Sequence, residues 1–448
     1  MFSPGKARFR QIQTTFMETF GLSRAAAFLA ILLIFSICIF SAYWFFHSAP
    51  PDTITLTAGP EGSVFQSNAD KYKKILARNG VKLKILPSQG SQENLKRLAD
   101  RSVRVDIGFV QGGVAQGLKT EGLVSLGSIS YQPLLVFYRS REPVSLLSGF
   151  AGQHIAIGPE GSGTHTLAMT LLAANGIEPG GDTFFVNLDS EDAVSALKSG
   201  KVSAVFLMGD SASVQTIRTL LRTEGIQLFS FAQADGYVRR INYLNKLELP
   251  QGSIDFGRNI PAHDIALIGP TVEIIARPDL HPALSDLLIE AAQEVHGNAG
   301  LLKRRGEFPA PIEHEFPISS DAARYYKSGK SFLYRYLPFW MASLVNRILV
   351  VFVPVVVLLI PGLRLIPLVF SWRIKLRILR WYRALLVLEQ DLILEMSSEV
   401  RRELLSRLDR IEDAVNKMRV PASFAEQFYV LRGHIDFVRS RLDRSNGH

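Results

Sequence analysis

A glycine-rich string that occurs twice in the sequence has the composition of an anion-binding turn. The string GPEGS at residues 59–63 recurs at residues 158–162, and each copy follows an apolar run and precedes a helical pattern. A helix start leaves backbone N–H groups unpaired, and glycine lets a ligand approach them closely. The positive end of the helix dipole lies there too, so the two turns suit a carboxylate or a dicarboxylate. The alternative is that Ser63 and Ser162 are ordinary helix N-caps without a ligand.

Polar residues follow the other predicted strands in the same way. Ligands of open α/β sheets bind beyond the carboxyl ends of the strands, so these turns belong to the same candidate site, although ordinary turn chemistry also explains them. Tyr131 lies between two apolar runs and is expected either to line the hinge or cleft or to be core. His165 is expected either to touch the anion or to have an exposed or capping role. The predicted ligand-binding residues are Gly59, Gly62, Ser63, Val64, Phe65, Ser88, Gly90, Ser91, Asn94, Gln111, Tyr131, Gly161, Ser162, Gly163, Thr164, His165 and Phe206.

No recognisable catalytic or metal-binding set is present in the sequence. There is no H-E-x-x-H, G-x-S-x-G or P-loop pattern, and none of the nine histidines has a partner at metal-ligand spacing. Cys38 is the single cysteine, which excludes an intrachain disulfide and a cysteine-based zinc site. The net charge of +9 comes largely from basic residues beside apolar runs, which argues against a nucleic-acid partner. We therefore predict a protein that is not an enzyme, with no catalytic residue, no metal and no cofactor.

Residues 52–330 alternate between short β-branched runs and helical patterns, which is typical of α/β lobes with mainly parallel strands. The pattern restarts at the expected strand 154–157, which leads into the second glycine-rich string, so we expect two similar lobes produced by an internal duplication. In the first half the expected strands are 54–57, 81–86 and 105–110, with helices at 63–78 and 92–99. In the second half the expected strands are 154–157, 183–186 and 202–207, with helices at 162–174 and 191–197.

Two apolar runs, at residues 25–46 and 348–370, are long enough to cross a bilayer. Basic residues dominate before the first run and after the second, which places both termini in the cytoplasm. The alternatives are a cleaved signal peptide for the first run and a buried helix for the second. The expected domains are a cytoplasmic segment (1–24), a span (25–46), an extracytoplasmic binding domain (47–340, with lobes at about 52–135 plus a C-terminal return and about 140–265), a second span (341–370) and a cytoplasmic helical tail (371–448).

The tail carries two apolar seams with the 4-3 spacing of packed helices, separated by a break at Pro421. One seam runs from Leu404 to Met418 and the other from Phe424 to Leu442, and Ser423 with Glu426 has the spacing of a capping box. We expect a C-terminal α-helical hairpin that packs on itself beside the membrane. A docking or signalling surface, or self-association through the tail, is the alternative.

Four segments of the external domain resemble the TAXI family of solute-binding proteins of TRAP transporters, which have a type II periplasmic-binding-protein fold. They are residues 57–65 (TAGPEGSVF), 88–95 (SQGSQENL), 106–111 (DIGFVQ) and 157–164 (IGPEGSGT), and the resemblance covers roughly residues 52–320. The chain departs from the family at Phe65 and Gln66, where tyrosines are common, and in its two spans and tail. The resemblance implies a two-lobed α/β domain that binds a small organic acid, such as an acidic amino acid or a dicarboxylate.

The same resemblance implies TRAP-type permease subunits as partners, beside the lipid bilayer, and a bacterial inner-membrane location with a periplasmic binding domain. Three functions remain open at this point. The first is a receptor that delivers the acid to a permease. The second is a ligand sensor that relays lobe closure through the spans to the tail. The third is a structural membrane protein whose cleft is vestigial.

Overall fold

The computed structural model describes residues 24–47, 49–140, 142–391, 398–418, 420 and 424–444. The predicted cytoplasmic segment 1–24 lies outside these residues except for its last position, and so does Ser423 of the expected capping box. The chain forms two compact units. One comprises residues 49–346, and the other comprises the chain before residue 49 and after residue 346.

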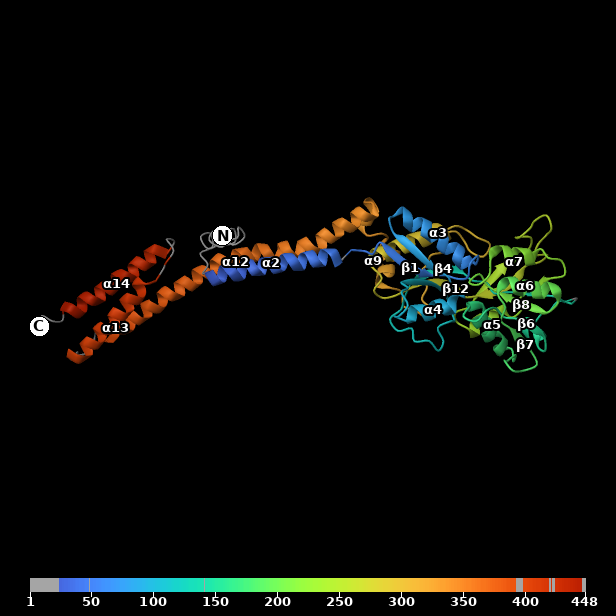
Figure 1. Cartoon of the computed structure of the whole chain (residues 1–448), viewed down its shortest axis with the longest axis horizontal. Coiled ribbons are helices and arrows are strands. Elements are labelled where there is room, and N and C mark those ends of the chain that lie inside the picture. The colour runs from blue at the N-terminus through green and yellow to red at the C-terminus, as the bar shows by residue number, and fades with distance from the viewer. Residues whose placement is uncertain are drawn as a thin grey trace, which may run out of the picture. The chain divides into compact units, whose positions relative to one another are not determined.

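Residues 49–346 contain two five-stranded sheets, one in each of two lobes (Figure 1). The lobe 1 sheet has the order β2 (Lys82–Leu86), β1 (Thr53–Thr57), β3 (Ile107–Gln111), β12 (Thr271–Ala276) and β4 (Val124–Tyr131). The lobe 2 sheet has the order β7 (Phe184–Val186), β6 (His154–Ala156), β8 (Ala204–Leu207), β5 (Leu135–Tyr138) and β9 (Gln227–Leu228).

Both sheets follow one plan. In lobe 1, β1 pairs in parallel with β2 and β3, and in lobe 2, β6 pairs in parallel with β7 and β8. In each sheet, one further strand from elsewhere in the chain pairs antiparallel with β3 or β8 on one side and with the edge strand β4 or β9 on the other. That strand is β12 in lobe 1 and β5 in lobe 2. The predicted two-lobed α/β architecture is confirmed, and the shared strand order is what the repeated string predicts.

Helices cover both faces of each sheet, as parallel strands require. Lobe 1 buries one face of α3 through Phe65, Tyr72 and Leu76. Lobe 2 has two core clusters, one containing α5 residues and the other containing residues of α6 and α7. The helices of this unit are α3 (Val64–Arg78), α4 (Ser91–Ala99), the 3-10 helix η1 (Leu147–Phe150), α5 (Gly163–Ala174), α6 (Ser190–Ser199), α7 (Val214–Leu221), α8 (Ala234–Arg240), α9 (Pro282–His296), α10 (Ser320–Ser328) and α11 (Phe332–Tyr336).

Two crossing segments connect the lobes. The chain leaves lobe 1 after β4 and enters β5, and it returns to lobe 1 from the antiparallel pair β10 (Asn245–Leu249) and β11 (Ile265–Gly269) into β12. The segments lie side by side, since Leu134 N donates to Ile268 O at 2.9 Å and Gln132 N donates to Pro270 O at 2.8 Å. Lobe 2 is therefore an insertion into lobe 1, held by a paired hinge.

The other unit contains α2 (Arg24–His47) and a long helix, α12 (Phe339–Asp391), which begins at the end of the lobed unit. In the described chain, one helix is long and apolar enough to cross a membrane, at Phe339–Gly362, and a shorter apolar helix lies at Ile31–His47. Both present apolar side chains outward, such as Phe40 (64% exposed) and Val357 (63% exposed). Such surfaces need an apolar environment. Two spans therefore stay a prediction, with one candidate found at residues 339–362.

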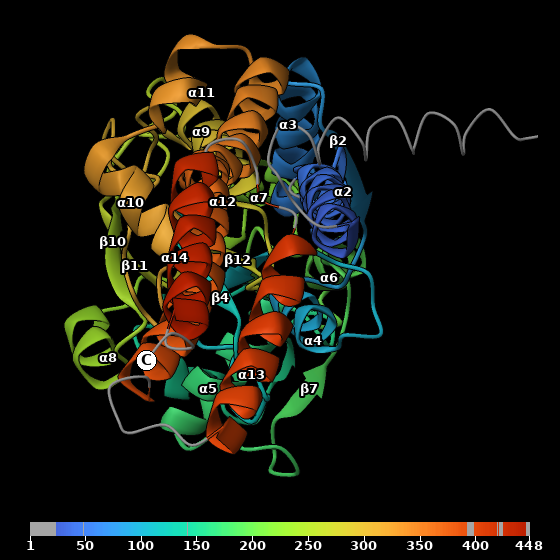
Figure 2. The same ribbon diagram turned by 90° about the vertical axis from the view of Figure 1, so that its left-hand side faces the viewer.

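The tail is a bundle of three helices rather than a hairpin alone. Helices α13 (Ser398–Asn416) and α14 (Ala425–Arg444) lie side by side (Figure 2). Their predicted seams bury Leu408 and Val438 completely, but the same core includes Ile378 and Leu385 from the end of α12. Spacing alone did not reveal this third helix, because the apolar run of the second span merges into it. The apolar seams of α13 and α14 are buried against helices of the same chain, which favours the prediction that the tail packs on itself.

A buried carboxyl group lies on an inner strand of the lobe 1 sheet, between β3 and β4. Glu273 of β12 is 2% exposed, and its Oε2 atom has no hydrogen-bond partner among the described residues. Burial raises the pKa of Glu273 to about 7, opposed by a hydrogen bond from Ser125 and reinforced by the negative charge of Glu315. The folded state therefore keeps this proton to higher pH than the unfolded chain does.

We expect the stability of the lobed unit to fall between pH 4.5 and 7, because the unfolded chain loses the Glu273 proton near pH 4.5 and the folded chain near pH 7. Glu273→Gln should remove this fall and stabilise the protein at pH 8 by up to roughly 3 kcal/mol. Glu248→Gln, at an exposed position of β10, is the matched control. Denaturation of the detergent-solubilised chain at pH 5 and pH 8 measures both, and equal pH profiles for Glu273→Gln and the wild type would contradict the assignment.

Candidate functional site at the lobe interface

The first predicted anion turn, at the start of α3, is paired entirely by protein groups. Ser63 caps the helix, with its Oγ accepting Gln66 N at 3.1 Å. The next two donors cross to lobe 2, where Val64 N donates to Ala212 O (3.2 Å) and Phe65 N to Gly209 O (3.3 Å). The carbonyl groups belong to the turn at residues 208–212, which follows β8 and is fully buried. We call this segment the 208–212 turn.

The second predicted anion turn, at the start of α5, holds a carboxylate. Ser162 caps the helix, with its Oγ accepting His165 N at 3.0 Å and donating to Pro159 O at 2.6 Å. Gly163 N donates to Asp210 Oδ2 at 2.5 Å, and Thr164 Oγ1 donates to Asp210 Oδ1 at 2.8 Å. The anion at this helix start is therefore a side chain of the 208–212 turn.

The start of α4 reaches the same carboxylate from lobe 1. Gly90, its N-cap residue, provides no side-chain cap, and Ser91 N makes a long hydrogen bond of 3.5 Å to Asp210 Oδ2. The third donor of this helix, Glu93 N, bonds Gly161 O of lobe 2 at 2.9 Å. A Cβ atom on Gly90 would lie 2.5 Å from Asp210 Oδ2, and the φ of +137° also requires glycine. The backbones of the two lobes therefore approach each other closely at Gly90.

Asp210 is completely buried and is surrounded by donors. A fourth hydrogen bond comes from Ser211 Oγ at 3.2 Å to Oδ1. Among the residues that the structure describes, no basic side chain forms an ion pair with it. Burial raises the pKa of Asp210, and the hydrogen bonds oppose this shift. Helix dipoles and N–H groups, rather than a cation, therefore stabilise the charge.

Two glutamines flank the carboxylate. Gln111 ends β3 and is 1% exposed, and its Oε1 has no hydrogen-bond partner among the described residues. Its amide lies against Gly163, where a Cβ atom would collide with it. Gln132, in the crossing segment, accepts hydrogen bonds from the N–H groups of Gly209 and Asp210 through its side-chain oxygen. The side-chain oxygen of Gln132 is thus bonded to the 208–212 turn, whereas that of Gln111 has no partner among the described residues.

Several predicted ligand residues serve the scaffold instead of facing the carboxylate. Asn94 accepts from Thr57 Oγ1 at 2.6 Å and from Ser88 Oγ at 2.7 Å, which ties together the ends of the first two strands. Phe206 is fully buried in a core cluster of lobe 2. Tyr131 lies where β4 enters the hinge, and its hydroxyl donates to Glu307 Oε1 at 2.8 Å.

The structure brings most of the remaining predicted residues to the lobe interface or its edge, whereas Gly62 is exposed with open space beside it. Phe65 contributes its N–H to that interface, while its ring packs on Phe109 in the lobe 1 core. His165 has its N–H capped by Ser162, and its Nδ1 has no partner among the described residues. The residues that contact the 208–212 turn or the opposite lobe are Gly59, Val64, Phe65, Gly90, Ser91, Gln111, Gly161, Ser162, Gly163 and Thr164. Their role in ligand binding stays a prediction.

Sequence reasoning missed Asp210 and the role of Gln132. The signal was present, because Gly209 and Asp210 follow a buried strand just as the glycine-rich strings do. A strand end that carries an acid was not expected at an anion site. The acceptor of a helix N–H group can be an acidic side chain of the same chain that is far away in the sequence. Asp210 is 47 residues from Gly163 and 119 residues from Ser91.

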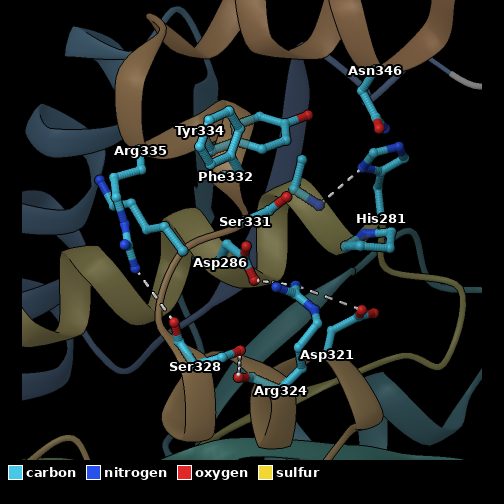
Figure 3. Close-up of a pocket in the computed structure, with 13 residues that line it drawn as sticks. His281, Asp286, Asp321, Arg324, Ser328, Ser331, Phe332, Tyr334, Arg335 and Asn346 are labelled. Carbon is cyan, nitrogen blue, oxygen red and sulfur yellow. Dashed lines mark hydrogen bonds and ion pairs between the residues drawn. The ribbon is translucent and has the colours of Figure 1, made fainter. Parts of the chain in front are cut away.

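A separate cavity of about 530 Å³ lies at the other end of lobe 1, between α9, α10 and α11 (Figure 3). Most of its charged groups form ion pairs within the chain, and Arg335 donates a hydrogen bond to Ser328 O at 3.4 Å. Arg324 contacts Asp286 at 2.7 Å and Asp321 at 3.8 Å, and Lys330 contacts Glu290 at 2.5 Å. These pairs fix α10 and the following loop to α9. An anion would have to break them, so we place the candidate site at the lobe interface.

The sequence model of the NMT1-like family matches residues 67–294, which is more than half of the chain. No curated protein matches the sequence. Among solved structures, a protein of Bordetella bronchiseptica RB50 is 15% identical, with a TM-score of 0.38 over 55% of this chain and 73% of its own. The periplasmic aliphatic sulphonate binding protein SsuA of Escherichia coli is 15% identical, with a TM-score of 0.34 over 66% of this chain and 84% of its own.

We expect Gly59→Ala to destabilise the closed lobes. A Cβ atom at this position would lie 2.5 Å from the Asp210 carbonyl oxygen and 2.6 Å from Ser63 Oγ. The backbone must shift to relieve this contact, which costs about 1–3 kcal/mol. Gly257→Ala is the matched control, because this exposed loop glycine has only an ordinary contact at 3.6 Å. Thermal unfolding of the full chain measures the difference, and equal midpoints for the two variants would show that the lobes do not approach so closely.

Proposed function

Because the chain belongs to the NMT1-like family, we propose that it is a membrane-tethered, extracytoplasmic solute-binding protein that captures a small organic acid between its two lobes. Acidic amino acids and dicarboxylates are the proposed ligands. The 208–212 turn carries this proposal, because the start of α5 already holds a carboxylate with a backbone N–H and a hydroxyl, without a cation. A site with such donors is chemically competent for the carboxylate of a ligand.

The hinge supports the binding mode. Two short crossing segments join the lobes, so the lobes can separate by changes at few residues and close again on a ligand. Some of the ligand-binding residues proposed from the sequence lie at this interface. When the lobes close on the acid, these residues would contact the acid instead of the opposite lobe. Lobe closure would be a population shift that the ligand favours because it bridges both lobes.

The proposed setting is the bacterial inner membrane. The apolar helix at Phe339–Gly362 supports one span, and the apolar part of α2 is the proposed second. We further propose that a TRAP-type permease receives the acid, on the grounds of the motifs that resemble the TAXI family. Both termini would lie in the cytoplasm and the lobed unit in the periplasm, in accordance with the positive charge beside each apolar run.

A ligand sensor is the second candidate function. Helix α12 supports it, because it runs without interruption from Phe339 to Asp391, past Pro354, Pro361 and Pro367, and its end belongs to the core of the tail bundle. A sensor should change the amide hydrogen exchange of residues 398–444 when the acid is added. A transport receptor should leave the exchange of these residues unchanged.

We expect glutamate, 2-oxoglutarate or succinate to raise the thermal unfolding midpoint of the detergent-solubilised full chain in a dose-dependent manner, because the ligand binds only the folded state. Thr164→Val should weaken this response about tenfold, since it removes a hydroxyl donor to a charged group at the site. Thr219→Val is the control, because its exposed hydroxyl bonds Gln215 O on α7. If no acid in this panel shifts the wild type, or if both variants respond alike, the proposal fails.

A further inference from the structure

The carboxylate at the lobe interface has the contacts of a bound ligand. Two helix starts, α5 of lobe 2 and α4 of lobe 1, direct N–H groups at one oxygen of Asp210, and two hydroxyls contact the other. All four partners are donors to a fully buried side chain. We propose that Asp210 is the resident occupant of the carboxylate site, and that a free acid enters this site only by displacing it. This inference concerns the site of the proposed function and rests on it for the identity of the competing acid.

The buried amide of Gln111 is the independent observation that this place is built for a ligand. Polar atoms buried without a partner are rare in folded proteins, because each costs the hydration it has lost. Gln111 Oε1 is such an atom among the described residues, and it lies against Gly163, whose N–H holds Asp210. An apolar side chain would be sufficient if this position served only the packing of lobe 1. A molecule that brings its own donor beside the carboxylate would satisfy it.

Displacement is feasible because the 208–212 turn is held mostly by its backbone. Within the turn, Ser211 N and Ala212 N donate to Met208 O at 3.3 Å and 2.9 Å, and the side-chain oxygen of Gln132 accepts the N–H groups of Gly209 and Asp210. When the lobes part, the turn loses its bonds to α3 and Asp210 loses Ser91 N, but the bonds within the turn and to Gln132 remain. The Asp210 side chain can then rotate away from Gly163 and Thr164 while the backbone of the turn keeps its place in lobe 2. A tethered carboxylate competes at a high effective concentration, so a simple monocarboxylate should not enter the wild-type site.

Asp210→Ala removes the carboxylate and leaves its donors, so formate, which is a carboxylate of minimal size, should refill the site. We expect Asp210→Ala to unfold at lower temperature than the wild type in the full chain, and 100 mM sodium formate to raise its midpoint by at least roughly 3 °C over 100 mM sodium chloride. The wild type should not respond, because its own carboxylate holds the donors.

Two matched variants control for other causes. Asp210→Asn keeps the volume of the side chain, so formate should have no room and no effect. Glu273→Ala removes the other buried carboxyl group described above, but that position lacks converging N–H groups, so formate should not stabilise it either. A formate response of Glu273→Ala equal to that of Asp210→Ala would mean that any cavity suffices, which would overturn the inference.

Two further outcomes decide the matter. A folded Asp210→Ala protein that ignores formate overturns the inference. If Asp210→Ala does not fold, Asp210→Asn replaces it: amide exchange at Gly163 should then accelerate at least tenfold, and unchanged exchange overturns the inference. Failure of the proposed function can be distinguished from failure of this inference. In that case no acid would raise the unfolding midpoint of the wild type, but formate would still stabilise Asp210→Ala.

Discussion

The structure of the lobed unit depends on backbone N–H groups at three helix starts. The first turns of α3, α4 and α5 point into the lobe interface, and buried donors of this kind must be paired or the fold loses stability. Serine caps satisfy one donor at α3 and one at α5. Other donors of α3 and α4 find acceptors across the interface, in the 208–212 turn and in Gly161, whereas Gly163 N of α5 bonds Asp210 within lobe 2. The lobes are closed by the same groups that would bind a ligand, so any ligand must replace protein acceptors rather than water.

The two halves look alike, but their helix starts are not used alike. Both sheets have the same strand order, and both glycine-rich strings lead into a serine-capped helix. The α3 start receives neutral carbonyl groups, whereas the α5 start receives a carboxylate. A charged acceptor makes a stronger hydrogen bond than a neutral one, so the halves differ in electrostatics despite their common topology. The structure therefore places the anion at the second string.

The sequence predicted the strands, the helices and their alternation well, because these follow from local periodicity and from glycine-rich turns. The expected helix at 162–174, for instance, is found at Gly163–Ala174. It predicted less about which residues meet. Phe206 lies in a continuous apolar run, so periodicity could not assign its side chain to the core or to the interface. Asp210 was missed because its contacts with Gly163 and Ser91 exist only once the lobes have formed and closed. The third helix of the tail was missed because spacing gives no boundary within α12.

Chain connectivity bears on the choice between receptor and sensor. Lobe 1 contains β1, the first strand of the lobed unit, as well as β12 and the helices that lead on to α11 and α12. Lobe 2 is attached only through the two crossing segments at the hinge. A movement of lobe 2 can therefore open the interface without displacing either end of the lobed unit. A ligand signal would need lobe 1 itself to change, for example where Asp286 and Arg324 join α9 to α10. Those groups lie outside the 208–212 turn and its partners, so the connectivity favours a receptor whose closure is recognised by a partner from outside.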